Sequence, residues 1–149
     1  MSKTVIFGFI AGFLAVLVFH QGAVFLLHHF GNAIPPLIEL IGRSNGPGYA
    51  TLPVPPFGVP QVISTAFWGG IWGIALAAIL RRGRGPDLLT GFLFGAIVTT
   101  LVAFTLVAWL KGMPLMAGGD TRRWLRAAFL NGTWGWGTAL LLRPLPFKG

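Results

Sequence analysis

Three long apolar runs limit what this chain can fold into. Residues 5–27, 62–80 and 88–110 each contain no aspartate, glutamate, lysine or arginine. A helix needs about 20 consecutive apolar residues to cross the hydrocarbon core of a bilayer, and each run is of that order. Only 9% of the 149 residues are charged, against roughly 25% in a soluble domain, so the chain cannot cover a surface that faces water. The sequence therefore predicts an integral membrane protein.

A fourth apolar run, residues 127–142, is shorter and predicts a fourth span once it is extended through Trp124 and Leu125. All eleven prolines lie outside these four segments, where a residue without a backbone N–H costs least. The first run is too long for the apolar part of a signal peptide, so we expect it to remain as an uncleaved helix. We expect an all-α membrane protein with four transmembrane helices in one domain, residues 1–149.

The second and fourth runs resemble each other. The strings AFWGGIWGIALAAILR at 66–81 and AFLNGTWGWGTALLLR at 128–143 align at an offset of 62, with tryptophans, glycines and the final arginine in register. GFIAG at 8–12 and GFLFG at 91–95 form a weaker match between the first and third runs. This pattern predicts two tandem helical hairpins in parallel orientation: repeat one at 4–82, with a long Pro/Gly-rich loop at 31–61, and repeat two at 88–143.

Two strings carry a resemblance to known proteins. PPFGVPQVISTAFWGGIWG at 55–73 and NGTWGWGTALLL at 131–142 resemble sequences of a family of small bacterial inner-membrane proteins that has no assigned biochemical role. The resemblance covers most of the chain and implies a four-helix protein of the bacterial inner membrane. It implies no catalytic or binding residue.

The basic residues predict the orientation of the helices. The net charge is +8, and lysines and arginines lie at the ends of the apolar runs, which favours membrane topology and anionic lipid over nucleic acid. The cluster RRGR at 81–84 favours a cytoplasmic location for both termini. Basic residues on the cytoplasmic side would then be Lys3, Arg81, Arg82, Arg84, Arg143 and Lys148, and those on the outer side Arg43, Lys111, Arg122, Arg123 and Arg126.

Glycines inside the runs predict close contact between helices, because small residues at four-residue spacing let backbones approach in lipid. The glycines expected to pack helices are Gly8, Gly12, Gly69, Gly70, Gly73, Gly91, Gly95, Gly132, Gly135 and Gly137. Trp72 and Trp134 lie well inside their runs, where we expect them to fill hollows left by glycines. Alternatively, they form a stacking wall for a flat ligand such as a quinone, a pigment or a lipid chain.

Few polar residues lie within the apolar runs, and such residues are candidates for function. His20, Gln21, Thr105 and Asn131 fall at a similar depth when the runs are drawn as straight helices. This polar layer is either a binding site or a set of hydrogen bonds that joins helices. Haem ligation by two histidines would need a second chain, because only the first run offers histidines.

Enzyme chemistry finds no support in the sequence. The three acids, Glu39, Asp87 and Asp120, lie in different loops, and the chain has no cysteine. We therefore expect a non-enzymatic protein with no catalytic residue, metal or cofactor. The predicted function is an accessory or scaffold subunit of a larger membrane complex, whose partners are lipids and either other membrane-protein subunits or further copies of the chain. The alternatives are a small transporter or channel that uses the polar layer, and a lipid, quinone or pigment binder that uses Trp72 and Trp134.

Overall fold

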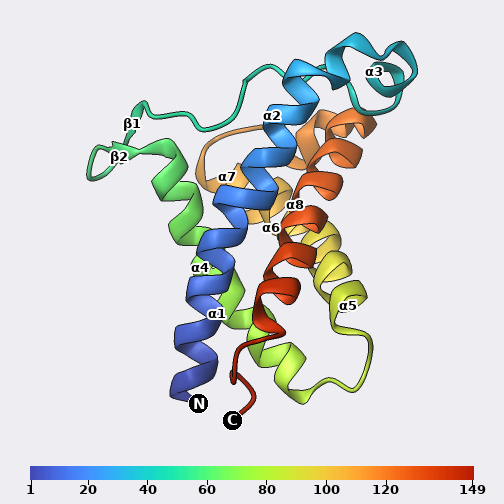
Figure 1. The fold of residues 1–149 in the computed structure, drawn as a ribbon. Coiled ribbons are helices and arrows are strands. Elements are labelled where there is room, and N and C mark those ends of the chain that lie inside the picture. Colours follow the sequence, from blue (N-terminus) through green and yellow to red (C-terminus); the bar gives the residue numbers. More distant parts are fainter.

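The computed structural model describes all 149 residues, and 74% of them are helical (Figure 1). The first long helix, Ser2–Ala33, comprises α1 (Ser2–Ala15), the π-helical segment η1 (Val16–His20), α2 (Gln21–His29) and the 3₁₀ turn η2 (Gly31–Ala33). The second is α4 (Gln61–Arg82). The third, Asp87–Leu110, comprises α5 (Asp87–Leu93), η3 (Phe94–Thr99), α6 (Thr100–Val102), η4 (Ala103–Val107) and α7 (Ala108–Leu110). The fourth is α8 (Thr121–Leu142).

The shorter elements all lie in connections. They are α3 (Pro35–Ile41), the 3₁₀ segment η5 (Leu115–Gly119) and two antiparallel strands, β1 (Pro53–Val54) and β2 (Val59–Pro60). The prediction of an all-α fold did not include the two strands, which have two residues each. They form a small hairpin just before α4, where proline and glycine favour a turn.

Three helices are long and apolar enough to cross a membrane: Ser2–Ala33, Gln61–Arg82 and Asp87–Leu110. These are the helices that the three charge-free runs predicted. The fourth long helix, α8, is as long as α4, with 22 residues, but it is not apolar enough to be one of these three membrane-length helices. Its first two turns carry Arg122, Arg123 and Arg126, and these lower its hydropathy.

Glycines bring α1 and α4 into backbone contact. A Cβ atom on Gly8 would lie 2.9 Å from both the Gly73 carbonyl oxygen and the Ala77 Cβ. A Cβ on Gly12 would overlap the Gly69 carbonyl oxygen and lie 2.8 Å from the Gly73 Cα. Side chains larger than hydrogen at these positions would hold the two helices apart, so the close packing of the first helix pair depends on glycine.

The second helix pair, formed by α5 and η3 with α8, repeats this arrangement. A Cβ on Gly91 would overlap the Gly135 carbonyl oxygen and lie 2.9 Å from the Ala139 Cβ. A Cβ on Gly95 would overlap the carbonyl oxygen of Asn131, the residue 62 positions after Gly69. The two pairs therefore use the same contacts, with asparagine in place of one glycine.

The remaining packing glycines accommodate aromatic rings of another helix. A Cβ on Gly70 would lie 2.6 Å from the ring of Phe9, and a Cβ on Gly132 would lie 2.7 Å from the ring of Phe92. Gly137 lies against the ring of Phe19. Each of the ten glycines named in the sequence analysis thus lies against a neighbouring helix.

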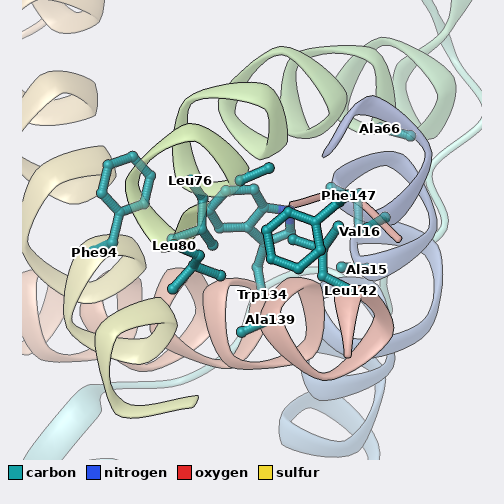
Figure 2. Close-up of a cluster of buried hydrophobic side chains, with 12 residues drawn as sticks. Ala15, Val16, Ala66, Leu76, Leu80, Phe94, Trp134, Ala139, Leu142 and Phe147 are labelled. Carbon is teal, nitrogen blue, oxygen red and sulfur yellow. The ribbon is translucent and has the colours of Figure 1, made fainter. Parts of the chain in front are cut away.

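The two helix pairs meet mainly where α1 and η1 lie against α8. At this contact Trp134 is buried and its indole Nε1 donates a hydrogen bond to the Gly12 carbonyl oxygen at 3.0 Å. Figure 2 shows the Trp134 ring in the midst of a buried apolar cluster that includes Leu76, Leu142 and Phe147. The core of the protein is therefore at the junction of the two pairs.

Candidate functional site

A cavity of about 160 Å³ lies between the helix pairs, and we call it the interhelical cavity. Residues from η1, α4, η3, η4 and α8 line it, so both pairs contribute to its walls. The lining residues are Val16, His20, Thr65, Trp68, Gly69, Trp72, Thr99, Ala103, Asn131 and Trp134.

Most of the lining residues occupy corresponding places in the two pairs. When the pairs are aligned on their glycine contacts, eight of the ten residues form four couples. The couples are Val16 with Thr99, His20 with Ala103, Gly69 with Asn131, and Trp72 with Trp134. The interhelical cavity is therefore centred on the place where the two pairs meet. In two of the couples, one pair has a polar side chain where the other has only a glycine or an alanine: Asn131 corresponds to Gly69, and His20 to Ala103.

The packing around the cavity is uneven. The first long helix packs closely on α8, whereas α4 has much less contact with the third long helix. On that looser side, Trp72 meets Phe94 edge to face with ring centroids 5.9 Å apart. Trp68 also lines the cavity and is 59% exposed. The cavity thus adjoins the outer surface beside α4.

The hydrogen bonds of Gln21 determine which nitrogen of His20 carries the proton. The Gln21 Oε1 accepts a hydrogen bond from the backbone N–H of Tyr49 at 2.7 Å, which leaves the amide nitrogen Nε2 on the other side. That Nε2 lies 3.2 Å from His20 Nδ1. An amide nitrogen only donates, so Nδ1 accepts and we assign the proton of the neutral imidazole to Nε2. His20 therefore offers a donor, Nε2–H, that has no partner in the chain.

Two further polar atoms at the cavity have no partner. The amide of Asn131 donates through Nδ2 to the Thr100 hydroxyl at 3.0 Å, which leaves the oxygen Oδ1 free to accept. The indole N–H of Trp134 donates to the Gly12 carbonyl oxygen of α1, whereas the indole N–H of Trp72 makes no hydrogen bond. Every fully buried side-chain nitrogen or oxygen of the chain has a partner, so these unpartnered atoms, like His20 Nε2, are accessible. Three of the residues that line the cavity thus carry an unpartnered polar atom: two donors, on His20 and Trp72, and one acceptor, on Asn131.

The structure brings together four of the six residues predicted for a polar or ligand site. His20, Asn131, Trp72 and Trp134 line the cavity, and Gln21 supports His20 from behind. Thr105 is elsewhere: it is exposed, and its hydroxyl donates to the Leu101 carbonyl oxygen of its own helix at 2.6 Å.

Sequence reasoning missed Thr65, Trp68 and Thr99, and it missed Thr100 as the partner of Asn131. Depth along a straight helix does not say which face a residue occupies, and the third long helix contains two π-helical segments, η3 and η4, that change its rotation. The alignment of GFIAG with GFLFG places Thr99 opposite Val16, one turn after the last glycine, but the sequence singled out neither residue.

The three carboxylates lie away from the interhelical cavity. Asp120 accepts hydrogen bonds from the backbone N–H groups of Arg122 and Arg123 and so caps α8. Asp87 forms an ion pair with Lys148 at 3.5 Å. No group of three or more histidines, aspartates or glutamates comes together in the chain. The cavity walls offer hydrogen bonds and aromatic contacts, which suit binding.

No protein-family model, curated protein or solved structure matches the chain. The resemblance to small bacterial inner-membrane proteins therefore stays a prediction. The size of the cavity, its aromatic lining residues and their unpartnered polar atoms define what it can hold.

Proposed function

We propose that this chain is an integral membrane protein that binds a ring-shaped, membrane-soluble molecule of the quinone type in the interhelical cavity. The observation that carries the proposal is the pair of donors, His20 Nε2 and Trp72 Nε1, that have no acceptor within the chain. A polar group without a partner costs free energy in hydrocarbon. A quinone ring carries two carbonyl oxygens, one for each donor, and would remove that cost.

The size of the cavity supports a single ring. An apolar cavity of about 150 Å³ is known to hold benzene, and the interhelical cavity measures about 160 Å³. A six-membered ring therefore fills it, and a long tail would extend into the bilayer beside Trp68, which is exposed there. Trp72 and Trp134 supply aromatic faces, against which a flat ring packs favourably.

The proposal includes a membrane setting with four crossings, in which the two helix pairs form a tandem parallel repeat. In its support, α8 is as long as α4 and makes the same glycine contacts with the third long helix that α4 makes with the first. Both chain termini lie at the same end of the bundle in Figure 1, as an even number of crossings requires. The basic cluster at the end of α4 lies at that end too, and it favours the cytoplasmic side of a bacterial inner membrane.

The glycine contacts give less support to an accessory or scaffold subunit. That prediction rested on small-residue faces that could pack against other proteins. In the structure these faces are occupied within the chain, since Gly8 and Gly12 lie against α4, and Gly91 and Gly95 against α8. These glycines are therefore not available to recruit another subunit.

A binding titration tests the proposal. We expect a short-chain benzoquinone to quench the tryptophan fluorescence of the protein in nanodiscs saturably, with one site per chain. His20→Leu removes one donor and should weaken binding about tenfold, because a hydrogen bond of this kind contributes about 1–1.5 kcal/mol. The matched control is His29→Leu, which replaces an exposed histidine of the same helix outside the cavity.

The control should bind like the unchanged protein. Quenching that rises linearly with quinone and is the same in both variants would indicate partition into the bilayer and would contradict the proposal. Native mass spectrometry of the same preparations reports whether a molecule of quinone mass is retained.

A further inference from the structure

A second and larger cavity, of about 440 Å³, lies at the end of the bundle that carries both termini. The start of α1 and the last turns of α4 form it, and we call it the arginine cavity. It is lined by Met1, Thr4, Val5, Ile74, Ala78, Arg81 and Arg82. It shares no residue with the interhelical cavity.

The two arginines of this cavity have no carboxylate partner. The chain contains two ion pairs, Arg123 with Asp120 and Lys148 with Asp87, and neither involves Arg81 or Arg82. Arg81 makes one weak contact, from Nη1 to the Thr4 hydroxyl at 3.4 Å. Thr4 in turn donates to the Phe147 carbonyl oxygen at 2.7 Å, which holds the C-terminal segment against α1. Most of the guanidinium donors therefore remain free to bind an anion.

The charged side chains at the end of the bundle that holds this cavity are mostly basic. Basic residues near this end of the helices are Lys3, Arg81, Arg82, Arg84, Arg143 and Lys148, and Asp87 is the one acid that begins a helix here. Asp87 already pairs with Lys148. A negative ligand is thus attracted to this end of the bundle, and the guanidinium groups of Arg81 and Arg82 can each bind phosphate through two N–H groups at once.

The other wall of the cavity is apolar. Val5, Ile74 and Ala78 line it, and Val5 is 42% exposed. Between Gln61 and Arg81, α4 carries no charged residue, so the arginines mark the level where its apolar part ends. A free phosphate ion would use the arginines alone, whereas a phospholipid would use the arginines for its phosphate and the apolar wall for the upper part of an acyl chain.

We propose that the arginine cavity is a binding site for one anionic glycerophospholipid, whose phosphate lies between Arg81 and Arg82 and whose acyl chain lies against Val5, Ile74 and Ala78. This inference goes beyond the quinone site and does not depend on it. The lipid would join the start of the first long helix to the end of α4, and so close the open end of the first hairpin.

Native mass spectrometry tests this site on the full chain, released from nanodiscs of equal phosphatidylglycerol and phosphatidylcholine. We expect one retained phosphatidylglycerol per chain. The double variant Arg81→Gln/Arg82→Gln should lower its retention about tenfold relative to the unchanged protein. The matched control, Arg122→Gln/Arg123→Gln, removes the same charge from α8 at the opposite end and should retain the lipid.

Three outcomes would overturn the inference. Equal loss in both double variants would indicate a general effect of net charge, and equal retention of phosphatidylcholine by the unchanged protein would show no preference for an anionic lipid. The third is complete displacement of the lipid by inorganic phosphate at millimolar concentration, which would indicate an anion site without an acyl-chain part. Should the arginine variant fail to fold, Ala78→Trp fills the apolar wall without a change in charge, and it should also release the lipid.

Discussion

Replacement of Gly12 by alanine tests the most constrained contact in the fold. Gly12 lies where α1 and α4 touch through their backbones, opposite Gly69 and Gly73. The added methyl group would overlap the Gly69 carbonyl oxygen, and backbone atoms cannot rotate away as a flexible side chain can. The two helices must therefore separate, and we expect a large loss of stability from one methyl group.

The size of that loss follows from the distances. The new Cβ would lie 2.8 Å from the Gly73 Cα, whereas ordinary contact begins at 3.4 Å, so the helices must part by at least about 0.6 Å, and by more at the Gly69 carbonyl oxygen, which lies closer. A gap of about 0.5–1 Å forfeits a quarter to a half of the dispersion attraction between the atoms that it separates. Overpacking of this kind costs about 1–3 kcal/mol. Because the overlap is with backbone, we expect about 3 kcal/mol, or about a hundredfold in the unfolding equilibrium.

The assay is equilibrium unfolding of the purified protein in mixed micelles with increasing dodecyl sulfate. Gly22→Ala is the matched control in the same long helix, since the nearest atom to its Cβ would be the Tyr49 hydroxyl oxygen at 3.9 Å. It should be neutral or slightly stabilising, because alanine favours a helix over glycine by up to about 1 kcal/mol. Gly95→Ala makes the equivalent overlap in the second helix pair and should cost as much as Gly12→Ala.

Equal stability of Gly12→Ala and Gly22→Ala would refute the reasoning, since the two variants differ only in what the new methyl group meets. A cost for Gly12→Ala but none for Gly95→Ala would refute a narrower point. It would mean that the second helix pair can separate freely, and that the two pairs are not equivalent in energy although they share the same contacts.

Three further predictions use the same unfolding assay. Trp134→Phe should lower the free energy of unfolding by about 1–2 kcal/mol, because it leaves the Gly12 carbonyl oxygen without its donor. Trp72→Phe should lower it by less than half as much, since the Trp72 indole N–H has no partner. Asp120→Ala removes the side-chain cap of α8 and should cost about 1 kcal/mol, while Asp120→Asn should keep most of the stability. Thr100→Val breaks a hydrogen bond between helices and should cost about 0.6 kcal/mol, whereas Thr105→Val, at an exposed site on the same long helix, should stay within about 0.3 kcal/mol of the unchanged protein.

The sequence was informative where a single physical requirement decides the structure. Charge-free runs of about 20 residues have few alternatives to a membrane-length helix, and the structure has such helices at Ser2–Ala33, Gln61–Arg82 and Asp87–Leu110. Glycines four residues apart on two neighbouring helices can be brought together in few ways, and Gly8 meets Gly73 as Gly91 meets Gly135.

Details that depend on rotation about a helix axis were not accessible from the sequence. The threonines illustrate this point, because Thr99, Thr100 and Thr105 lie on one helix and the pattern could not say which of them faces α8. Thr99, the last residue of the π-helical segment η3, and Thr100, the first residue of α6, both donate to the Gly95 carbonyl oxygen, at 2.5 and 3.3 Å. A π-helical turn holds more residues than an α-helical one, so a position projected with ideal α geometry falls on the wrong face.

The tautomer of His20 also required the long first connection, which sequence patterns treat as a loop. Tyr49 fixes the amide of Gln21 through its backbone N–H, and its hydroxyl donates to the Leu17 carbonyl oxygen at 2.7 Å. Nothing in the residues around His20 predicts that a segment almost thirty positions later would orient it. The loop thus contributes to the site indirectly, because Tyr49 holds the Gln21 side chain that orients the imidazole of His20.

The cavity depends on both the likeness and the difference of the two helix pairs. Likeness places Trp72 and Trp134 across the junction as matching aromatic walls. Difference adds to the polarity of the cavity, since Asn131 stands where the first pair has Gly69, and His20 stands where the second pair has Ala103. Had both pairs carried glycine and alanine at these places, the cavity would lack the imidazole and the amide, and its remaining polar groups would come from Thr65, Thr99 and the tryptophans. These two side chains add hydrogen-bonding atoms without closing the space: a donor at His20 and an acceptor at Asn131. If the proposed function holds, the donor of His20 would favour a ring that carries a carbonyl oxygen over an apolar ring of the same size.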